Sequence, residues 1–233
     1  MKTAIVTGAS SGIGLEICKK LNLENITVFG FGRDFGKINY THPLFHPITC
    51  DLLKTTYLTE EIKRIRSEHE ISILVNNAGV GYYGPHEEQN PTKIHEMITV
   101  NLEVPVLLSQ LLLRDIKKNA GYIFNISSVT ATKSSPHGCA YAATKAGLAS
   151  FSTSLFDETR KYGVKVINIM PDMTKTSLYR NANFDVAESL DTYLDPLEVA
   201  ECVMYILKQR EGLVITDITI KPQRHQLSKT TRN

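Results

Sequence analysis

Short runs of β-branched and apolar residues alternate with longer stretches of helical periodicity along almost the whole chain. This alternation is typical of βαβ units, in which neighbouring strands are parallel and helices cover the sheet. It predicts an α/β fold with a mainly parallel sheet. Seven runs are expected to be strands: Thr3 to Thr7, Ile26 to Gly30, His46 to Cys50, Ile71 to Asn76, Gly121 to Ile126, Val164 to Met170 and Val214 to Ile220.

The stretches between these runs are expected to be helices. Asp195 is a suitable N-cap for the last of them, and Pro196 suits the first helical position. With 233 residues and no internal repeat, the chain suits one domain. The predicted helices span Ile13 to Asn22, Leu53 to Glu68, Thr92 to Lys117, Ala140 to Lys161 and Pro196 to Gln209.

Charge and cysteine usage narrow the class of protein. A net charge of +2 argues against a protein that binds nucleic acid or a membrane surface, and no apolar run reaches the roughly 20 residues of a membrane span. The four cysteines are scattered without a Cys-x-x-Cys motif, so we expect no metal site, no disulfide framework and a cytoplasmic location. The basic stretch from Lys221 is expected to be a solvated tail, the alternative being a phosphate-binding arm.

A glycine-rich turn, Thr7-Gly8-Ala9-Ser10-Ser11-Gly12-Ile13-Gly14, follows the first predicted strand and opens the first predicted helix. Free backbone N–H groups and the helix dipole favour a phosphate at such a helix N-terminus. Glycine also lets the backbone approach a pyrophosphate closely. The turn therefore indicates a dinucleotide site, with a purely structural turn as the alternative.

The end of the second strand bears on which dinucleotide binds. An acidic residue there would bind the ribose 2′-hydroxyl of NAD, but this chain has Gly32-Arg33. A guanidinium can pair with a 2′-phosphate, which favours NADP(H). Asp34 complicates this prediction because it is either a ribose ligand or the partner of Arg33.

Polar residues also follow three other predicted strands. Asp51 is placed either to accept from an adenine amino group or to cap the next helix. The Asn76 to Gly79 turn lies at the sheet edge where doubly wound folds bind ligands. Ser128 ends the fifth strand and is able to donate to a carbonyl oxygen. Asn101 lies inside a long amphipathic helix, where it either serves a ligand site or bonds to local backbone beside a kink at Pro105.

Tyr141 and Lys145 are four residues apart in a predicted helix, and residues with this spacing are neighbours on one helix face. A free tyrosine has a pKa of about 10, so an acid/base role at neutral pH needs a shift of roughly three units, or ~4 kcal/mol. A nearby ammonium supplies part of that shift. A Tyr-x-x-x-Lys pair alone is weak evidence, because two solvated residues would give the same pattern.

Together these motifs make the chain resemble the short-chain dehydrogenase/reductase family in its compact form, from Thr3 to about Pro222. The resemblance implies a single Rossmann-type doubly wound domain with a seven-stranded sheet and helices on both faces, in residues 1–222. A substrate loop over about 172–195 and a basic C-terminal tail over 223–233 would complete the chain. The motifs are Thr-Gly-x-x-x-Gly-x-Gly from Thr7, Asn-Asn-Ala-Gly from Asn76, Asn101, Ser128, and Tyr-x-x-x-Lys from Tyr141.

The resemblance also implies roles for individual residues. Ser128 would hold a carbonyl oxygen and Tyr141 would protonate it. Lys145 would bind the nicotinamide ribose and lower the pKa of Tyr141, and Asn101 would hold a relay water. The expected cofactor-binding residues are Gly8, Ser10, Ser11, Gly12, Ile13, Gly14, Arg33, Asp51, Leu52, Asn77, Ala78, Gly79, Tyr141, Lys145, Pro171, Thr174 and Thr176.

Two departures from the family pattern are Ser11, where a basic residue usually precedes the second glycine of the turn, and Asp172, where glycine usually follows the proline. Ser11 weakens the prediction of NADP(H). Asp tolerates left-handed backbone, so the turn is expected to survive. Substrate contacts are expected mainly from Met173 to Leu194, with Thr130 to Cys139 on the opposite wall.

We therefore expect an oxidoreductase that transfers hydride between NADP(H), in preference to NAD(H), and a small or medium carbonyl or alcohol. The alternative is a regulatory or sensor protein that binds NADP(H) without turnover. The expected partners are a small-molecule substrate and further copies of the chain in a homodimer or homotetramer, with no nucleic acid and no membrane.

Overall fold

A parallel sheet forms the centre of the computed structural model, which describes residues 2–229. Its seven strands follow the order β3-β2-β1-β4-β5-β6-β8, and every neighbouring pair is parallel. The chain order reverses on the two sides of β1, which confirms the doubly wound α/β prediction. The strands are β1 (Thr3–Thr7), β2 (Thr27–Gly32), β3 (Phe45–Thr49), β4 (Ile71–Asn76), β5 (Tyr122–Ile126), β6 (Lys165–Pro171) and β8 (Asp217–Ile220).

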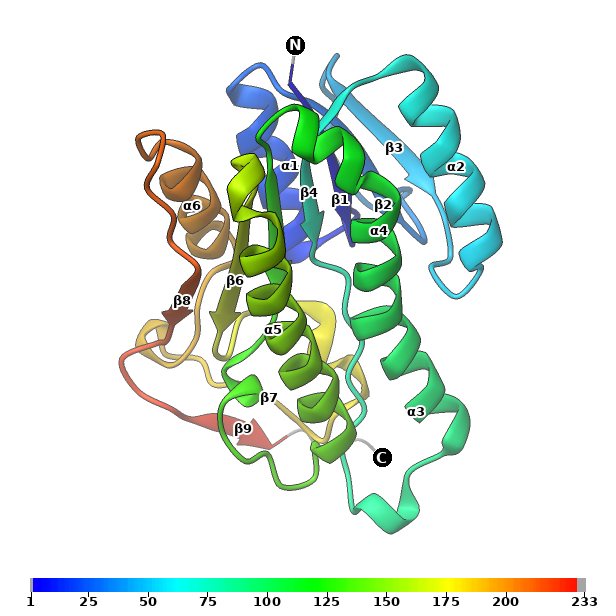
Figure 1. Ribbon diagram of the computed structural model, residues 1–233. Helices are drawn as coiled ribbons and strands as arrows, with labels where there is room; N and C mark the ends of the chain where they lie inside the picture. Colours follow the sequence, from blue (N-terminus) through cyan, green and yellow to red (C-terminus); the bar gives the residue numbers. More distant parts are fainter. Residues whose placement is uncertain (1, 230–233) are drawn as a thin grey trace.

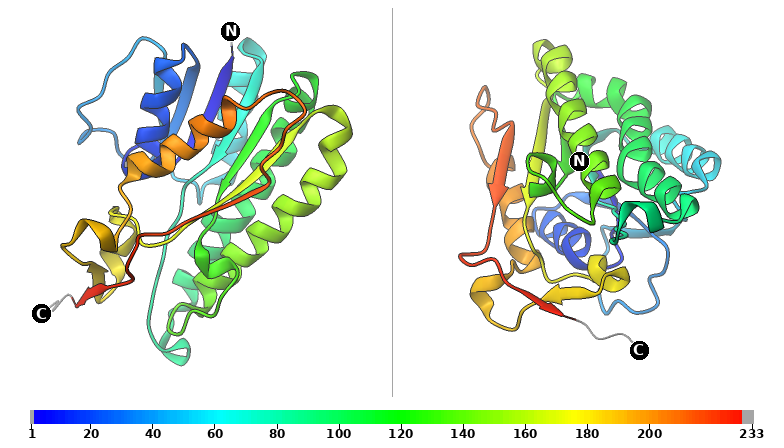
Figure 2. Two further views of the ribbon diagram at one scale, coloured as in Figure 1. Left: turned by 90° about the vertical axis from the view of Figure 1, so that its left-hand side faces the viewer. Right: turned by 90° about the horizontal axis from the view of Figure 1, so that it is seen from below.

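Helices cover both faces of this sheet (Figures 1 and 2). On one face lie α1 (Gly12–Leu23) and α6 (Pro196–Leu207), and on the other α2 (Thr55–Glu68), α4 (Val104–Lys118) and α5 (Cys139–Thr159). Alternate residues of a strand point to opposite faces, so β1 contributes Ile5 to one apolar core and Ala4 and Val6 to the other. Both β1 and the central strand, β4, are buried throughout.

The helix predicted from Thr92 to Lys117 is divided into three parts. A regular helix, α3 (Pro91–Ile98), leads into a π-helical turn over Thr99–Glu103, and α4 follows. The interruption precedes Pro105, which lies in the first turn of α4 and needs no intrahelical N–H bond there. The combined segment Pro91–Lys118 is long and apolar enough to cross a membrane, but half of its apolar window is buried in the protein.

Predicted helix starts and strand ends mostly agree with the structure. Asp195 caps α6 through a complete capping box with Glu198, and Pro196 follows it, as predicted. The second strand runs two residues beyond its predicted end, to Gly32, whose carbonyl accepts from the Cys50 amide at 2.8 Å. The short 3₁₀ segments are His86–Glu88, Val129–Ala131, Arg160–Tyr162, Ser177–Asn181 (η5) and Leu190–Thr192 (η6).

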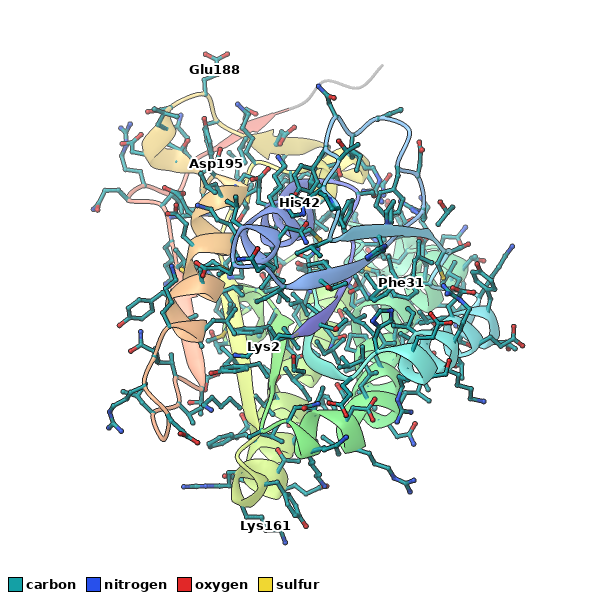
Figure 3. The ribbon with its side chains drawn as sticks, turned by 90° about the horizontal axis from the view of Figure 1, so that it is seen from above. Lys2, Phe31, His42, Lys161, Glu188 and Asp195 are labelled. Atoms are coloured by element: carbon teal, nitrogen blue, oxygen red, sulfur yellow. The ribbon has the colours of Figure 1, made fainter. Side chains whose placement is uncertain are left out.

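Two short strands were not predicted. β7 (Phe184–Val186) and β9 (Leu227–Lys229) form a separate antiparallel sheet at the carboxyl edge of the main one (Figures 1 and 2). Residues 223–227 are exposed, as expected of a solvated tail, but Leu227–Lys229 pair with β7 in the predicted substrate loop of residues 172–195, here called the substrate segment. The remainder of the predicted tail lies outside the described residues. Figure 3 shows Glu188 at the outer rim of this segment and Asp195 where it joins α6.

Candidate active site

A cleft of about 220 Å³ opens at the carboxyl ends of the strands, where the direction of winding changes. Residues from almost every predicted motif meet there, although they are far apart in sequence. The cleft is lined by these predicted residues: Gly8, Ser10, Ser11, Gly12, Ile13, Arg33, Asp51, Leu52, Asn77, Ala78, Gly79, Ser128, Tyr141, Lys145, Pro171, Thr174 and Thr176. Gly14 and Asn101 do not line it.

The glycine turn has the backbone that a phosphate site requires. Gly8 and Gly12 have φ of +67° and +53°, in the region that favours glycine. Ser11 is the N-cap of α1, but its side chain makes no capping hydrogen bond. The backbone amides of the first helical turn are therefore not occupied by a capping side chain. Gly14 serves packing, since a Cβ there would lie 2.3 Å from the Gly8 carbonyl oxygen. The turn therefore fits a dinucleotide phosphate.

The substrate segment approaches this turn from the other side of the cleft. Thr176, at the start of η5, has its methyl carbon 3.1 Å from the position that a Cβ on Gly12 would take. Its hydroxyl oxygen accepts from the Leu178 amide at 3.3 Å. Thr174, on the same segment, is buried and donates from its hydroxyl to the Asp172 carbonyl.

Asn77 holds the turn after β4 against the glycine turn. Its side-chain amide donates to the carbonyls of Thr7 and Gly8, at 2.9 and 3.3 Å. In return, the Thr7 hydroxyl accepts from the backbone amides of Asn77 and Ala78. Asn77 therefore shapes the cofactor end of the cleft through protein contacts of its own.

The charged residues near the end of β2 and β3 have distinct partners. Arg33 is exposed and lines the cleft. Asp34 accepts from the Gly36 amide at 2.8 Å, and among the described residues it forms no ion pair with Arg33. Asp51 lines the cleft and also accepts from the Leu53 amide at 3.1 Å, four residues before α2 begins. Asp51 therefore closes a local turn and is not the N-cap of α2.

Tyr141 and Lys145 lie one turn apart on α5, on its buried face. Only 4% of Tyr141 and 3% of Lys145 is exposed. The Lys145 ammonium nitrogen is 5.8 Å from the centroid of the Tyr141 ring and donates to the Ile126 carbonyl at 2.8 Å. The same nitrogen is 3.7 Å from where a Cβ on Gly79 would stand, so this glycine keeps space open beside it.

Ser128, rather than Ser127, lies beside Tyr141. Ser128 gives its phenol a hydrogen bond and accepts from the Thr130 amide at 3.2 Å. Ser127 points the other way, because its hydroxyl donates to the Lys145 carbonyl at 3.0 Å. Adjacent residues of an extended chain face opposite sides, which is the reason for this division.

Burial determines the protonation of this pair. It raises the pKa of Tyr141 to about 12, although the hydrogen bond from Ser128 lowers that pKa. It also lowers the pKa of Lys145 to about 8. In the protein alone, desolvation therefore dominates the pKa of Tyr141, and the group that lowers this pKa is Ser128, not the expected Lys145. The phenol is therefore neutral and carries its proton at neutral pH.

Asn101 is fully buried and connects two elements that border the site. Its side-chain oxygen accepts from the Val80 amide, and its side-chain nitrogen donates to the Val80 carbonyl, both at 2.9 Å. The nitrogen also donates to the Thr144 hydroxyl on α5 at 3.1 Å. The alternative of a bond to local backbone is therefore wrong. The π-helical turn supplies the local geometry for these distant contacts.

Asp172 lines the cleft where the family usually has glycine, and its backbone does not adopt a left-handed conformation. Its side chain accepts from the Met173 amide at 2.9 Å. Lys133 and His225 approach the carboxylate at 3.8 and 4.0 Å. The chain therefore makes this turn with Asp172 in place of glycine. The left-handed backbone that was expected at this position is not needed.

Several residues at the site were not predicted from sequence. Glu96 and Arg180 line the cleft, and the Tyr82 hydroxyl donates to Glu96 at 2.6 Å. Tyr83 packs against Tyr141 with ring centroids 5.7 Å apart. None of them belongs to a motif. The one sequence signal for this loop was the pair of glycines on either side of Tyr82 and Tyr83, which indicates tight turns beside the site.

Known proteins are similar to this chain in sequence and in fold. The family model for short chain dehydrogenases matches residues 2–187. An uncharacterised oxidoreductase of Staphylococcus epidermidis is 30% identical over 227 residues, which cover 95% of this chain and 97% of that protein. The chain therefore belongs to the short-chain dehydrogenase family of oxidoreductases.

Solved structures agree with this assignment. A metagenomic short-chain oxidoreductase in complex with NADP has a TM-score of 0.79 at 27% identity, covering 95% of this chain and 97% of that one. An alcohol dehydrogenase of the archaeon Thermococcus sibiricus, complexed with 5-hydroxy-NADP, has a TM-score of 0.87 at 24% identity, covering 97% and 99%. At that identity, the archaeal structure supports the fold alone.

The buried ammonium makes a measurable prediction about stability. Because the pKa of Lys145 is lowered from 10.5 to about 8 in the folded state, the unfolded state binds more protons between these values, and stability rises with pH there. Relative to Lys145→Met, the wild-type free energy of unfolding should increase by about 2 kcal/mol from about pH 7.5 to about pH 9.5. Urea denaturation of the unliganded proteins measures this difference.

Tyr141→Phe is the control, because the raised pKa of Tyr141 lies above this pH range. Its free energy of unfolding should follow that of the wild type. A constant difference between wild type and Lys145→Met would contradict a buried, desolvated ammonium.

Proposed function

We propose that this protein is an NADP(H)-dependent reductase of small or medium carbonyl compounds, or an alcohol dehydrogenase in the reverse direction. The observation that carries the proposal is the joint burial of Ser128, Tyr141 and Lys145 at one end of a cleft whose other end is the glycine turn. An acid, a hydrogen-bond donor and a cation are thereby adjacent to a phosphate-binding turn.

Each of the three side chains has a chemical role that follows from its environment. The Ser128 hydroxyl, which donates towards the Tyr141 phenol, is placed to orient a carbonyl oxygen at the same point. Tyr141 gives its proton to that oxygen as general acid, and its raised pKa keeps the proton available at neutral pH. In the reverse reaction it must lose the proton, which requires more positive charge nearby than the protein alone provides.

Lys145 and Asn101 support this acid. The Lys145 ammonium, next to the space that Gly79 leaves open, is placed to bind the nicotinamide ribose. Asn101 holds the Val80 backbone and the Thr144 hydroxyl, and we propose that it also orders a water between Lys145 and solvent. When bound, the nicotinamide supplies the hydride.

The preference for NADP(H) is part of the proposal and rests on the end of β2. Arg33 lines the cleft without an ion pair among the described residues, so its guanidinium is available to a 2′-phosphate. Asp34 is turned to the Gly36 amide. Ser10 packs 2.8 Å from where a Cβ on Gly32 would stand, which leaves no room for an acidic side chain at that position.

Replacing Tyr141 by Phe tests the chemistry. The substitution removes the proton donor, so turnover of a panel of aldehydes and ketones, followed by loss of NADPH absorbance, should fall by at least about 100-fold. The dissociation constant for NADPH, measured by its fluorescence, should stay within about twofold, because the ring remains in place. Equal turnover by both proteins would contradict the mechanism.

Replacing Arg33 by Ala tests the cofactor preference. A lost charge-assisted contact to a 2′-phosphate should weaken NADPH binding by roughly 10-fold or more, and NADH binding should change little. The ratio of the two dissociation constants is therefore the measurement, and Arg64→Ala, at an exposed position on α2, is the matched control. An unchanged ratio would exclude the phosphate contact.

A second candidate function is a regulatory or sensor protein that binds NADP(H) without turnover. Burial that keeps Tyr141 neutral is compatible with it, but retention of the full Ser128, Tyr141 and Lys145 set favours catalysis. Tight NADPH binding by the wild type with no activity on a broad carbonyl panel would favour the sensor.

The expected homodimer or homotetramer and the expected cytoplasmic location stay predictions. Val106 on α4 is partly exposed, which is compatible with a helix-mediated interface. Light scattering at micromolar concentration should show a mass above that of one 26.0 kDa chain. A monomeric mass would contradict the assembly.

A further inference from the structure

The chain from Arg224 to Lys229, here called the C-terminal strap, lies along the substrate segment (Figure 2). Its first residue, Arg224, binds η6 of that segment. The Arg224 guanidinium donates to both carboxylate oxygens of Asp191, at 2.5 and 2.9 Å, and its backbone amide donates to the Asp191 carbonyl at 2.8 Å. A bidentate pair of this kind fixes orientation as well as distance.

The rest of the strap pairs with β7. Phe184, Asp185 and Val186 face Lys229, Ser228 and Leu227 in an antiparallel register. The Ser228 hydroxyl donates to the Val186 carbonyl at 3.0 Å, which adds a side-chain contact to the ladder. Two strands of three residues are marginally stable alone. We therefore expect this pairing to depend on the adjacent hydrogen bonds between Arg224 and Asp191.

Phe184, the first residue of β7, belongs to an aromatic wall with Tyr83 and Tyr179. Its ring centroid lies 5.1 Å from that of Tyr83 and 5.6 Å from that of Tyr179. Tyr83 in turn contacts Tyr141 at 5.7 Å. Ring contacts therefore run without a break from the strand that the strap holds to the proposed acid.

Backbone hydrogen bonds close the base of the substrate segment without the strap, whose one approach to this base is that of His225 to the Asp172 carboxylate at 4.0 Å. The Leu194 amide donates to the Met173 carbonyl at 2.7 Å, and the Lys175 amide donates to the Leu194 carbonyl at 2.9 Å. Thr174 and Thr176, which border the cofactor end of the cleft, are close to this base. Loss of the strap should therefore free β7 and Phe184 while leaving the cofactor end intact.

We propose that the C-terminal strap positions the aromatic wall beside Tyr141 and thereby determines which carbonyl compounds bind, with Arg224 as the positioning residue. Tyr179 lines the cleft, and Phe184 packs against both Tyr179 and Tyr83 behind it, so the wall suits a carbonyl compound with a flat apolar group next to its C=O. The assignment of the wall to substrate binding rests on the proposed function. The positioning of the wall by the strap does not.

The chain contains no tryptophan, so Phe184→Trp introduces a single fluorescent reporter into the wall. In this background, Arg224→Ala should shift the emission maximum to longer wavelength and increase acrylamide quenching by at least about twofold, because the indole becomes hydrated. Combining Asp191→Arg with Arg224→Asp should restore both signals. Truncation after Gln223 should reproduce the effect of Arg224→Ala.

Arg66→Ala is the matched control. Arg66 makes a bidentate pair with Asp115, at 2.6 and 2.9 Å, but this pair joins α2 to α4 away from the substrate segment. It should leave the tryptophan emission unchanged. If Arg224→Ala does not fold, as judged by circular dichroism, the milder Arg224→Lys replaces it. Unchanged emission in the folded Arg224 variant and in the truncated protein would overturn the positioning role.

Steady-state kinetics with NADPH then test the substrate class. These measurements use proteins that retain Phe184 and do not carry the tryptophan reporter. With 4-nitrobenzaldehyde, a flat apolar probe, Arg224→Ala should raise KM at least about fivefold with kcat and the NADPH dissociation constant within about twofold. With dihydroxyacetone, a small polar probe, KM should change little. An equal rise for both probes, or none, would overturn the role of the wall in specificity. Absence of any turnover by the wild type would count against the proposed function, while the emission experiment still decides the positioning role.

Discussion

Three hydrogen bonds between β5 and α5 are the constraint on which the site depends. Asn125 donates to Ser152, Ser127 donates to the Lys145 carbonyl, and the Lys145 ammonium donates to the Ile126 carbonyl. Because all three are buried, each would cost free energy if broken without a new partner. They fix both the height and the rotation of α5 against the sheet. Tyr141 is consequently presented at the carboxyl edge, beside Ser128, which lies two residues after the end of β5.

The same logic extends to the other loops of that edge. Asn77 ties the turn after β4 to the glycine turn after β1, and Asn101 ties it to α5 through Val80 and Thr144. Asparagine suits these positions because one side chain offers both a donor and an acceptor to neighbouring backbone. The asparagines that mark the family motifs are thus connectors between loops. Their hydrogen bonds fix the positions of the loops that line the cleft.

Much of this could be predicted from sequence because the signals are local. Alternating apolar runs predicted the seven strands of the main sheet, and the capping residues Asp195 and Pro196 predicted where α6 begins. The structure places Ser128, Tyr141 and Lys145, which the motifs singled out, at one cleft. What was missed depends on contacts between distant segments. Each of β7 and β9 contributes only three residues to their pairing, too few to show the alternating pattern of a strand. The ion pair of Arg224 with Asp191 joins residues that are 33 positions apart. Similarly, desolvation of Tyr141 depends on Tyr83 and the substrate segment, which no helical spacing reveals.

The contact of Thr176 with Gly12 has a kinetic consequence. The phosphate turn is covered by the same segment that carries η5, so a dinucleotide bound at the turn would leave only after that segment lifts. Opening would then include the substrate wall as well, because Tyr179 and Thr176 are on one stretch of chain. Coenzyme exchange and product escape would then share a single opening step.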